Sequence, residues 1–217
     1  MDYSKSQEIL RDFYNRNNII ENFERDNQYL EAAFHEIAEI WLNNFVQIKK
    51  VRFLMIAEAP LWGNSKNYIY NPTTQFTQFF HKGDLEHILN IKIKDKPDFI
   101  NRCNEIGLLF IDISPFPLNS TDTSINYQTI SKYQYQELIE KTIPIFLEEK
   151  IKAIKIKKVD NIKVFFRYSR VQRIFQNSIS KVLIDNLFIK SENDIMEISK
   201  RGGGIDKLKF KNIITLN

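Results

Sequence analysis

Val-Arg-Phe-Leu-Met-Ile-Ala, residues 51–57, is a nearly continuous apolar run that ends in Glu58-Ala-Pro-Leu-Trp-Gly63. A strand that is buried on both faces has this composition, which is typical of parallel sheets. Pro60 and Gly63 force the chain to turn directly after the run. We therefore predict that residues 51–57 form a central strand of a parallel sheet, with Glu58 at its carboxyl end.

Two further apolar runs follow the same pattern. Residues 106–113 read Ile-Gly-Leu-Leu-Phe-Ile-Asp-Ile and are closed by a turn that begins with Ser114-Pro115. Residues 161–167 read Asn-Ile-Lys-Val-Phe-Phe-Arg. Each run is predicted to be a buried strand, and residues 182–189 and 194–198 are expected to be short strands or connections.

Helical periodicity fills the segments between these strands. Residues 4–46 predict two helices with a break at Asn17-Asn18, and residues 131–150 predict a long helix. Shorter helices are expected over residues 75–81, 84–105 (interrupted near Lys96-Pro97) and 171–179, whereas residues 151–158 fit either a helix end or an edge strand. This alternation implies right-handed crossovers, and so predicts a three-layer α/β/α sandwich around a central, mostly parallel, four-stranded sheet.

The length and composition suit one domain of this α/β class. A chain of 217 residues can bury a sufficient core without disulfides or a structural metal. We expect a single domain over residues 1–217, with the helical segment 1–46 packed on it. The single cysteine, Cys103, excludes an internal disulfide and a cysteine-based zinc or iron–sulfur site.

The N-terminal sequence and the net charge bear on the cellular location of the protein and on its partners. The first residues lack the apolar core of a signal peptide, and no run approaches the ~18 apolar residues of a membrane-spanning helix. A cytoplasmic location without membrane association is therefore expected. A net charge of +4 is compatible with nucleic acid as a partner, although many proteins of this charge bind none.

Acidic side chains follow two of the predicted strands. In parallel α/β sheets ligands bind beyond the carboxyl ends of the strands, which places Glu58–Gly63, Asp112–Pro117 and Arg167–Arg170 on one rim. A carboxylate where a buried strand ends costs free energy unless it is solvated, paired or used, which makes Glu58 and Asp112 candidate site residues. Each of them could also serve only to cap or form a turn.

Aromatic and basic side chains are expected at the same rim. Trp62 and Tyr70 occupy a loop from which a flat ring can stack on a nucleobase. Arg167, Arg170 and the loop Lys200-Arg201-Gly202-Gly203-Gly204 can contact phosphates, although exposed arginines are usually only solvated and a glycine triplet also suits a surface turn. The histidine and glycine spacings fit no metal or dinucleotide motif, so neither a metal nor a cofactor is expected.

These segments resemble the uracil-DNA glycosylase superfamily. Ala57-Glu58-Ala59-Pro60 is similar to the Gly-Glu-Ala-Pro motif of one branch, with Ala57 in place of Gly. Residues 107–112 resemble the strand that closes with a base-reading Asn, with Asp112 in its place, and residues 162–168 resemble a later strand. Lys200-Arg201-Gly202-Gly203 stands where the family has His-Pro-Ser-Pro, so the histidine that stabilises the departing base is missing.

The resemblance implies a protein that binds nucleic acid, DNA in particular, flips a base into the crevice and can hydrolyse its N-glycosidic bond. Glu58 would position the attacking water, and Lys200 would supply positive charge for the departing base. Tyr70 or Trp62 would clamp the base while Asp112 reads its edge. The nucleic acid itself would be held by Arg167, Arg170, Arg201, Gly202 and Gly203.

Two alternatives stay open at this point. The missing histidine favours a non-catalytic module of the same fold that binds nucleic acid or a nucleotide. An unrelated α/β enzyme with a small polar substrate is the other alternative. If the site is active, an ionised Asp112 accepts but does not donate hydrogen bonds, so ordinary uracil is not expected to be the preferred base.

Overall fold

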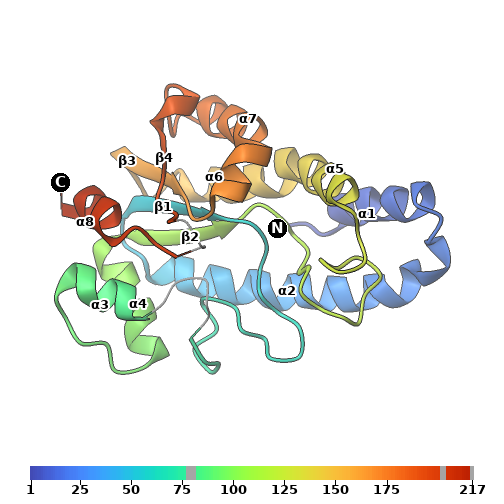
Figure 1. Cartoon of the computed structure of the whole chain (residues 1–217), viewed down its shortest axis with the longest axis horizontal. Coiled ribbons are helices and arrows are strands. Elements are labelled where there is room, and N and C mark those ends of the chain that lie inside the picture. The colour runs from blue at the N-terminus through green and yellow to red at the C-terminus, as the bar shows by residue number, and fades with distance from the viewer. Residues whose placement is uncertain (77–81, 201–203, 216–217) are drawn as a thin grey trace.

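A four-stranded parallel sheet forms the centre of the fold in this computed structural model, which describes residues 1–76, 82–200 and 204–215 (Figure 1). The strands are β1 (Val51–Ala57), β2 (Leu108–Asp112), β3 (Lys158–Phe166) and β4 (Ile195–Glu197), in the order β2-β1-β3-β4. All three strand pairs are parallel. β1 is buried at every position except Arg52, which confirms the prediction of a central strand from its apolar run.

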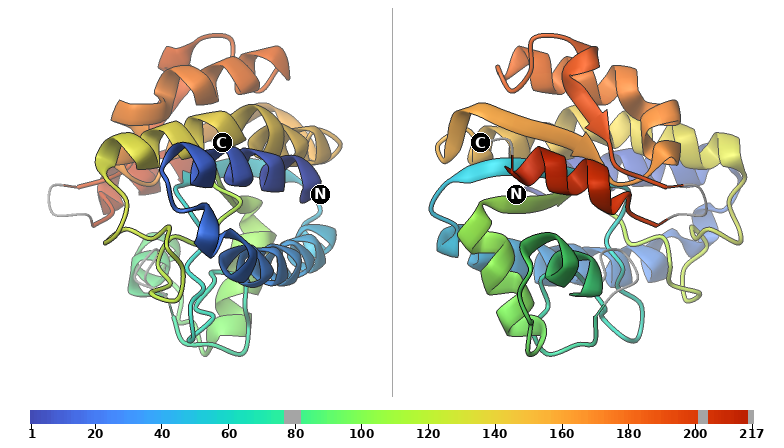
Figure 2. Two further views of the ribbon diagram at one scale, coloured as in Figure 1. Left: turned by 90° about the vertical axis from the view of Figure 1, so that its right-hand side faces the viewer. Right: turned by 60° about the vertical axis from the view of Figure 1, so that its left-hand side comes forward.

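Helices cover both faces of the sheet, which confirms the predicted α/β sandwich (Figures 1 and 2). One layer contains α2 (Phe23–Gln47), α3 (Lys82–Leu89) and α4 (Lys96–Ile106), and the other contains α5 (Lys132–Thr142), α6 (Glu148–Ile154) and α7 (Ser169–Asp185). α1 (Ser4–Arg16) contacts both α5 and α2, and α8 (Lys207–Thr215) packs on α3. The short 3-10 turn Ile20–Asn22 stands at the break predicted between the first two helices.

Several predicted boundaries were wrong. Helix α7 continues to Asp185 because its buried face continues through Val182 and Leu183, so of residues 182–189, expected to be a short strand or a connection, only residues 186–189 form a connection. The long helix predicted over 131–150 contains a π-helical turn at Ile143–Leu147 between α5 and α6. Residues 151–158 complete α6 and begin β3.

Two more differences concern chain segments that lack a clear apolar pattern. α8 was not predicted. The helix predicted over 75–81 falls mostly on residues 77–81, which lie outside the described residues, and residues 75 and 76 are not helical. The break predicted in the helical segment 84–105 is confirmed, because α3 ends at Leu89 and α4 begins at Lys96 with Pro97 in its first turn.

Side chains close the outer edge of β2. The Tyr70 hydroxyl accepts a hydrogen bond from the Phe110 N–H at 2.6 Å, and Trp41 Nε1 donates to the Phe110 carbonyl oxygen at 3.1 Å. Unpaired backbone groups on an edge strand can template pairing with another chain. Tyr70 and Trp41 satisfy both groups of Phe110 and so protect this edge.

Candidate active site at the carboxyl edge of the sheet

The neighbouring strands β1 and β3 lead into opposite helix layers. After β1 the chain passes to the side of α3 and α4, and after β3 it enters α7 on the other side (Figure 1). A reversal of this kind opens a crevice beyond the carboxyl ends of the two strands, where ligands of α/β sheets bind. Glu58 follows β1 directly, and Tyr168 and Arg170 follow β3, so these residues stand where the topology places a ligand site.

Glu58 lies among one arginine and two tyrosines. Its side chain is only 12% exposed, and its Oε1 atom is 3.7 Å from Nη2 of Arg170, whose side chain is 45% exposed. The Arg170 guanidinium also lies 4.5 Å from the centre of the Tyr135 ring and 5.8 Å from that of Tyr127. Burial and then the charge of Glu58 raise the pKa of both tyrosines, which places their hydroxyls beside this carboxylate.

The Glu58 carboxylate has unused hydrogen-bonding capacity. Oε1 is buried and makes no hydrogen bond of normal length to a described residue, and the same holds for the Tyr135 hydroxyl. Native proteins pair most of their buried polar atoms, so such atoms at a strand end suit a water or a ligand. Glu58, Tyr135, Tyr127 and Arg170 therefore form an acidic site with one cation and two phenolic donors.

The start of helix α5 fixes the position of Tyr135. Ser131 Oγ accepts from the Gln134 N–H at 3.2 Å, and Gln134 Oε1 accepts from the Ser131 N–H at 2.8 Å. This capping box sets the first turn of the helix, so that Tyr135 points inward and its ring packs on Phe175 of α7. Tyr127 and Tyr135 were not predicted as site residues, although the Ser-x-x-Gln spacing of residues 131–134 is a visible signal for a helix start.

Asp112 occupies a different environment from Glu58. It pairs with Ala57 in the β1–β2 ladder, so it shares the face of Ala57, whereas Glu58, one residue later, turns toward α5 and α7. Asp112 is buried and lines a small cavity of about 20 Å³ together with Ala57, Ala59, Pro60 and Tyr68. A space of that size holds about one water molecule.

Burial raises the pKa of Asp112, and the positive charge of Lys150 acts in the opposite direction. The Tyr68 hydroxyl makes no hydrogen bond of normal length to a described residue, yet it is close enough to Asp112 for the carboxylate to add to the burial that raises its pKa. A protonated Asp112 can both donate and accept a hydrogen bond. The two acids expected on one rim therefore end adjacent strands and face different sides of the sheet, although after burial the charges of both raise the pKa of Tyr127 and of Tyr168.

Lys150 is a buried cation that the sequence analysis missed. Its Nζ lies 4.4 Å from the centre of the Phe146 ring and 5.2 Å from that of Trp41, and it makes no hydrogen bond to a described residue. Burial lowers the pKa of Lys150 to about 8 against the favourable charge of Asp112. In the sequence, Lys150 is one of several lysines near a helix end, and only its burial beside the rings of Phe146 and Trp41 distinguishes it.

The two predicted base-clamping residues are structural. Tyr70 is buried with its hydroxyl hydrogen-bonded to β2, and Trp62 is buried with its backbone N–H donating to Asn119 Oδ1 at 3.0 Å. Tyr68, rather than Tyr70 or Trp62, lines the cavity beside Asp112. The polar hydroxyl did not keep Tyr70 near solvent, because the edge of β2 supplies its partner.

The predicted phosphate contacts also differ in position. Arg167 is buried, with its guanidinium 4.4 Å from the centre of the Tyr168 ring, and burial lowers its pKa, so it does not suit contact with a surface phosphate. Arg170 is exposed but contacts Glu58. Lys200 is exposed, and its N–H donates to the Gly204 carbonyl oxygen at 2.7 Å. Arg201, Gly202 and Gly203 lie outside the described residues.

No family model, no curated protein and no solved structure matches this chain. Within residues 1–76, 82–200 and 204–215, no group of three or more His, Cys, Asp or Glu side chains could hold a metal ion. In the same described ranges, no helix has the length and apolar character needed to cross a membrane.

Proposed function

We propose that this chain binds nucleic acid at the crevice between β1 and β3 and hydrolyses the N-glycosidic bond of an unpaired base. One observation carries the proposal. The segments that resemble glycosylase motifs end or directly follow the four parallel strands: Glu58 follows β1, Asp112 ends β2, Arg167 follows β3 and Lys200 comes shortly after β4. Parallel strands present their carboxyl ends at one edge, so the four segments share that edge.

Glu58 is the residue best suited to the chemical step. A carboxylate whose buried oxygen makes no hydrogen bond of normal length to a described residue can orient a water molecule and take its proton as the water attacks the sugar carbon. The carbon–nitrogen bond then breaks and the electron pair leaves with the base. Arg170 and Lys200 supply positive charge for the phosphates and the departing base, and Asp112 reads the base edge beside Tyr68.

The small size of the cavity beside Asp112 favours a second candidate, a module that binds nucleic acid without catalysis. A cavity of about 20 Å³ does not admit a base unless the segment after β1 moves. That segment is held by Lys96, whose Nζ donates to the Tyr68 carbonyl oxygen at 2.8 Å and to Thr74 Oγ1 at 2.7 Å. The two candidates therefore differ in whether the segment opens to admit a base.

The test compares the wild type with Glu58→Gln on single-stranded oligonucleotides that carry one uracil or one amino-bearing base. Both bases are needed because an ionised Asp112 only accepts hydrogen bonds, whereas a protonated Asp112 both donates and accepts them. The wild type is expected to release a base and leave an alkali-labile site, and Glu58→Gln to lower that rate about 10²–10⁴-fold while the oligonucleotide affinity is kept.

The matched control is Glu39→Gln, the same substitution at an exposed position on α2, which is expected to change neither quantity. Salt-dependent binding with no base release in the wild type would support the non-catalytic module instead. An absence of salt-dependent oligonucleotide binding would exclude both candidates.

A further inference from the structure

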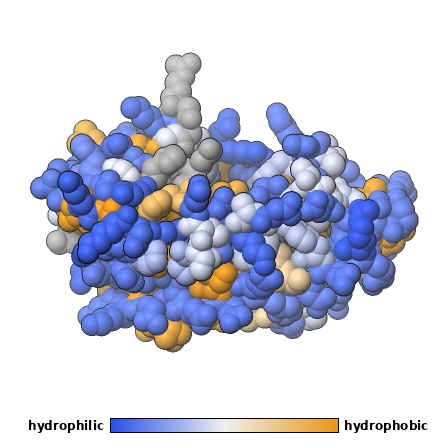
Figure 3. Space-filling model, turned by 90° about the horizontal axis from the view of Figure 1, so that it is seen from below, coloured by the Kyte–Doolittle hydropathy of each residue, from blue (hydrophilic) through white to orange (hydrophobic). Residues whose placement is uncertain are grey.

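Two adjoining hollows lie between helices α2 and α4, with volumes of about 570 and 380 Å³. Gln47, Asn101 and Asn104 line both hollows, which therefore form one groove, named here the amide groove. It reaches the start of β1, at the opposite edge of the sheet from Glu58. Figure 3 views the molecule from the side of α2 and shows mostly hydrophilic residues there.

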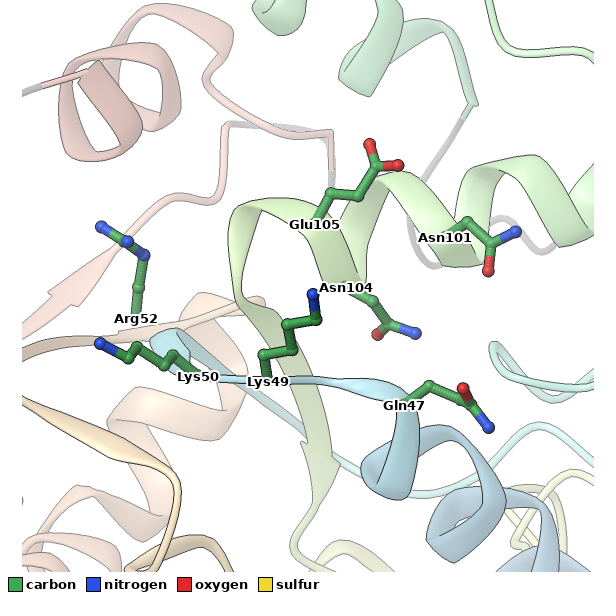
Figure 4. Close-up of a pocket in the computed structure, with 7 residues that line it drawn as sticks. All are labelled: Gln47, Lys49, Lys50, Arg52, Asn101, Asn104 and Glu105. Atoms are coloured by element: carbon green, nitrogen blue, oxygen red, sulfur yellow. The ribbon is translucent and has the colours of Figure 1, made fainter.

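Three cations form the end of the amide groove at the start of β1. Lys49, Lys50 and Arg52 line it and make no ion pair with any residue that the structure describes. Figure 4 shows the Lys49 side chain rising toward α4, with those of Lys50 and Arg52 together on one side of it. Glu105 is at the same end, but its Oε2 is 2.9 Å from Nη1 of Arg102.

The backbone at this end is held in place. The Arg52 N–H donates to the Gly107 carbonyl oxygen at 2.9 Å, and Gly107 has a φ of 77°. A Cβ at Gly107 would lie 2.6 Å from the Lys50 carbonyl oxygen, so only glycine allows this close approach. Lys50 and Arg52 are thus presented from a fixed strand start.

Five carboxamides line the rest of the groove, beside Ile40, Tyr70, Pro72, Pro97 and Ile100: Asn43, Asn44, Gln47, Asn101 and Asn104. Asn104 Nδ2 donates to Asn44 Oδ1 at 2.9 Å. This bond leaves Asn44 Nδ2 and Asn104 Oδ1 buried with no hydrogen-bond partner among the described residues. A buried, unsatisfied donor and acceptor cost free energy, and an adjacent donor and acceptor complement the edge of a nucleobase.

The carboxyl ends of α2 and α4 at this groove would repel an anion if their last carbonyls were free. They are covered. Lys157 Nζ donates to the carbonyl oxygens of Phe45 at 2.7 Å and Ile48 at 2.8 Å, and the Gly107 N–H donates to that of Asn104 at 3.1 Å. Lys49, Lys50 and Arg52 therefore keep their charge available for a ligand.

We propose that the amide groove binds a nucleotide, with its phosphates at Lys49, Lys50 and Arg52 and its base against Asn44 and Asn104. A free nucleotide and a nucleotide unit of a single strand offer the same groups. None of Glu58, Asp112, Tyr127, Tyr135 and Arg170 lines this groove, so the inference does not depend on the glycosidic reaction.

Calorimetric titration of the full chain with pyrophosphate and with nucleoside 5′-diphosphates tests the inference, and a fluorescent single-stranded oligonucleotide provides a third probe. The nucleotide is expected to bind saturably and more tightly than pyrophosphate, because only the nucleotide reaches the carboxamides. Lys49→Gln/Lys50→Gln is expected to weaken binding roughly tenfold or more, since two charge-assisted phosphate contacts are lost. Asn101→Leu, an exposed position in the groove, is expected to weaken nucleotide binding but not pyrophosphate binding.

The control is Lys92→Gln/Lys94→Gln, which removes the same charge from exposed positions before α4. Oligonucleotide binding that is lost only in Lys49→Gln/Lys50→Gln, without binding of free nucleotide, would identify a strand as the source. Equal losses in the two double variants, or no saturable binding of any probe, would overturn the inference. Glu58→Gln keeps its groove binding if the inference is right, even where it loses base release.

Discussion

Glu58 and Asp112 stand at the ends of neighbouring strands, yet their surroundings differ. The cation beside Glu58 is Arg170, which is exposed and makes a contact of 3.7 Å. The cation that acts on Asp112 is Lys150, which is buried and makes no ion pair with a described residue. One acid thus belongs to a site that solvent reaches, and the other to the interior.

The comparison shows that the alternation of side chains along a strand determines which helix layer each acid faces. Asp112 is level with Ala57, so one further residue is enough to turn Glu58 toward the opposite helix layer. An ion pair at the surface contributes little, while a buried charge carries a large desolvation cost. We therefore expect substitutions around the two acids to change stability by different amounts and with opposite signs.

The largest change in the free energy of unfolding is expected for Lys150→Met. Methionine has a similar length, keeps the packing on Trp41 and Phe146, and removes a buried ammonium that lacks a hydrogen bond. Because the pKa of Lys150 is lowered from 10.5 to about 8, the charged form is disfavoured in the fold. We expect the free energy of unfolding at pH 7 to rise by about 2 kcal/mol after the loss of the cation–π contacts.

The pH dependence of the same variant gives a second measurement. Between pH 8 and 10.5 the folded wild type binds fewer protons at Lys150 than the unfolded chain, so its stability rises with pH. The advantage of Lys150→Met in urea denaturation is therefore largest below pH 8 and shrinks as the pH approaches 10.5. Lys155→Met, at an exposed position, serves as the control, and a destabilised Lys150→Met would show that the attraction between Lys150 and Asp112 outweighs the desolvation cost of the buried ammonium.

A smaller increase in the free energy of unfolding is expected for Asp112→Asn. Burial raises the pKa of Asp112 above 3.8, so the folded chain binds more protons than the unfolded chain just above that pH. The wild type therefore loses stability as the pH rises through this range, and the amide variant does not. At neutral pH we expect Asp112→Asn to be more stable by roughly 1 kcal/mol, the common size of a single substitution.

Urea denaturation of the wild type and of Asp112→Asn across acidic to neutral pH checks this expectation. Asp122→Asn, at an exposed position of the following loop, removes the same charge without burial and is expected to change little. Curves for Asp112→Asn and the wild type that stay parallel at all pH values would show that the Asp112 carboxyl titrates as it does in the unfolded chain.

The sequence predicted the sheet, but it did not predict that Glu58 and Asp112 face different sides of it. The apolar runs that became β1 and β2 were recognisable because each is buried on both faces. β3 begins earlier than predicted, at Lys158, because its first residues are partly exposed and carry no apolar signal. The separation of Glu58 from Asp112 follows from the register of β1 on β2, which no periodicity in either strand reveals.

Side-chain roles that depend on packing could not be predicted from the sequence either. Tyr68 and Tyr70 are two residues apart and chemically identical, yet one faces the cavity beside Asp112 and the other closes the edge of β2. Arg167 was expected at the surface because it follows a strand, but it is buried against Tyr168. Position relative to a strand end thus predicted the neighbourhood of a residue, but not its exposure.

The smallest change in the free energy of unfolding is expected for Arg170→Gln, next to the more exposed acid, Glu58. Its guanidinium is 3.7 Å from Glu58 and lies over the Tyr135 ring, but the side chain is 45% exposed, so water screens both contacts. We expect a loss of at most about 1 kcal/mol in the free energy of unfolding, which decreases further at high salt. Arg173→Gln, an exposed position one turn along α7, is the control and should change nothing. A loss for Arg170→Gln that is insensitive to salt and exceeds the gain for Lys150→Met would mean that Glu58, and not Asp112, is the acid whose charge the interior of the fold must stabilise.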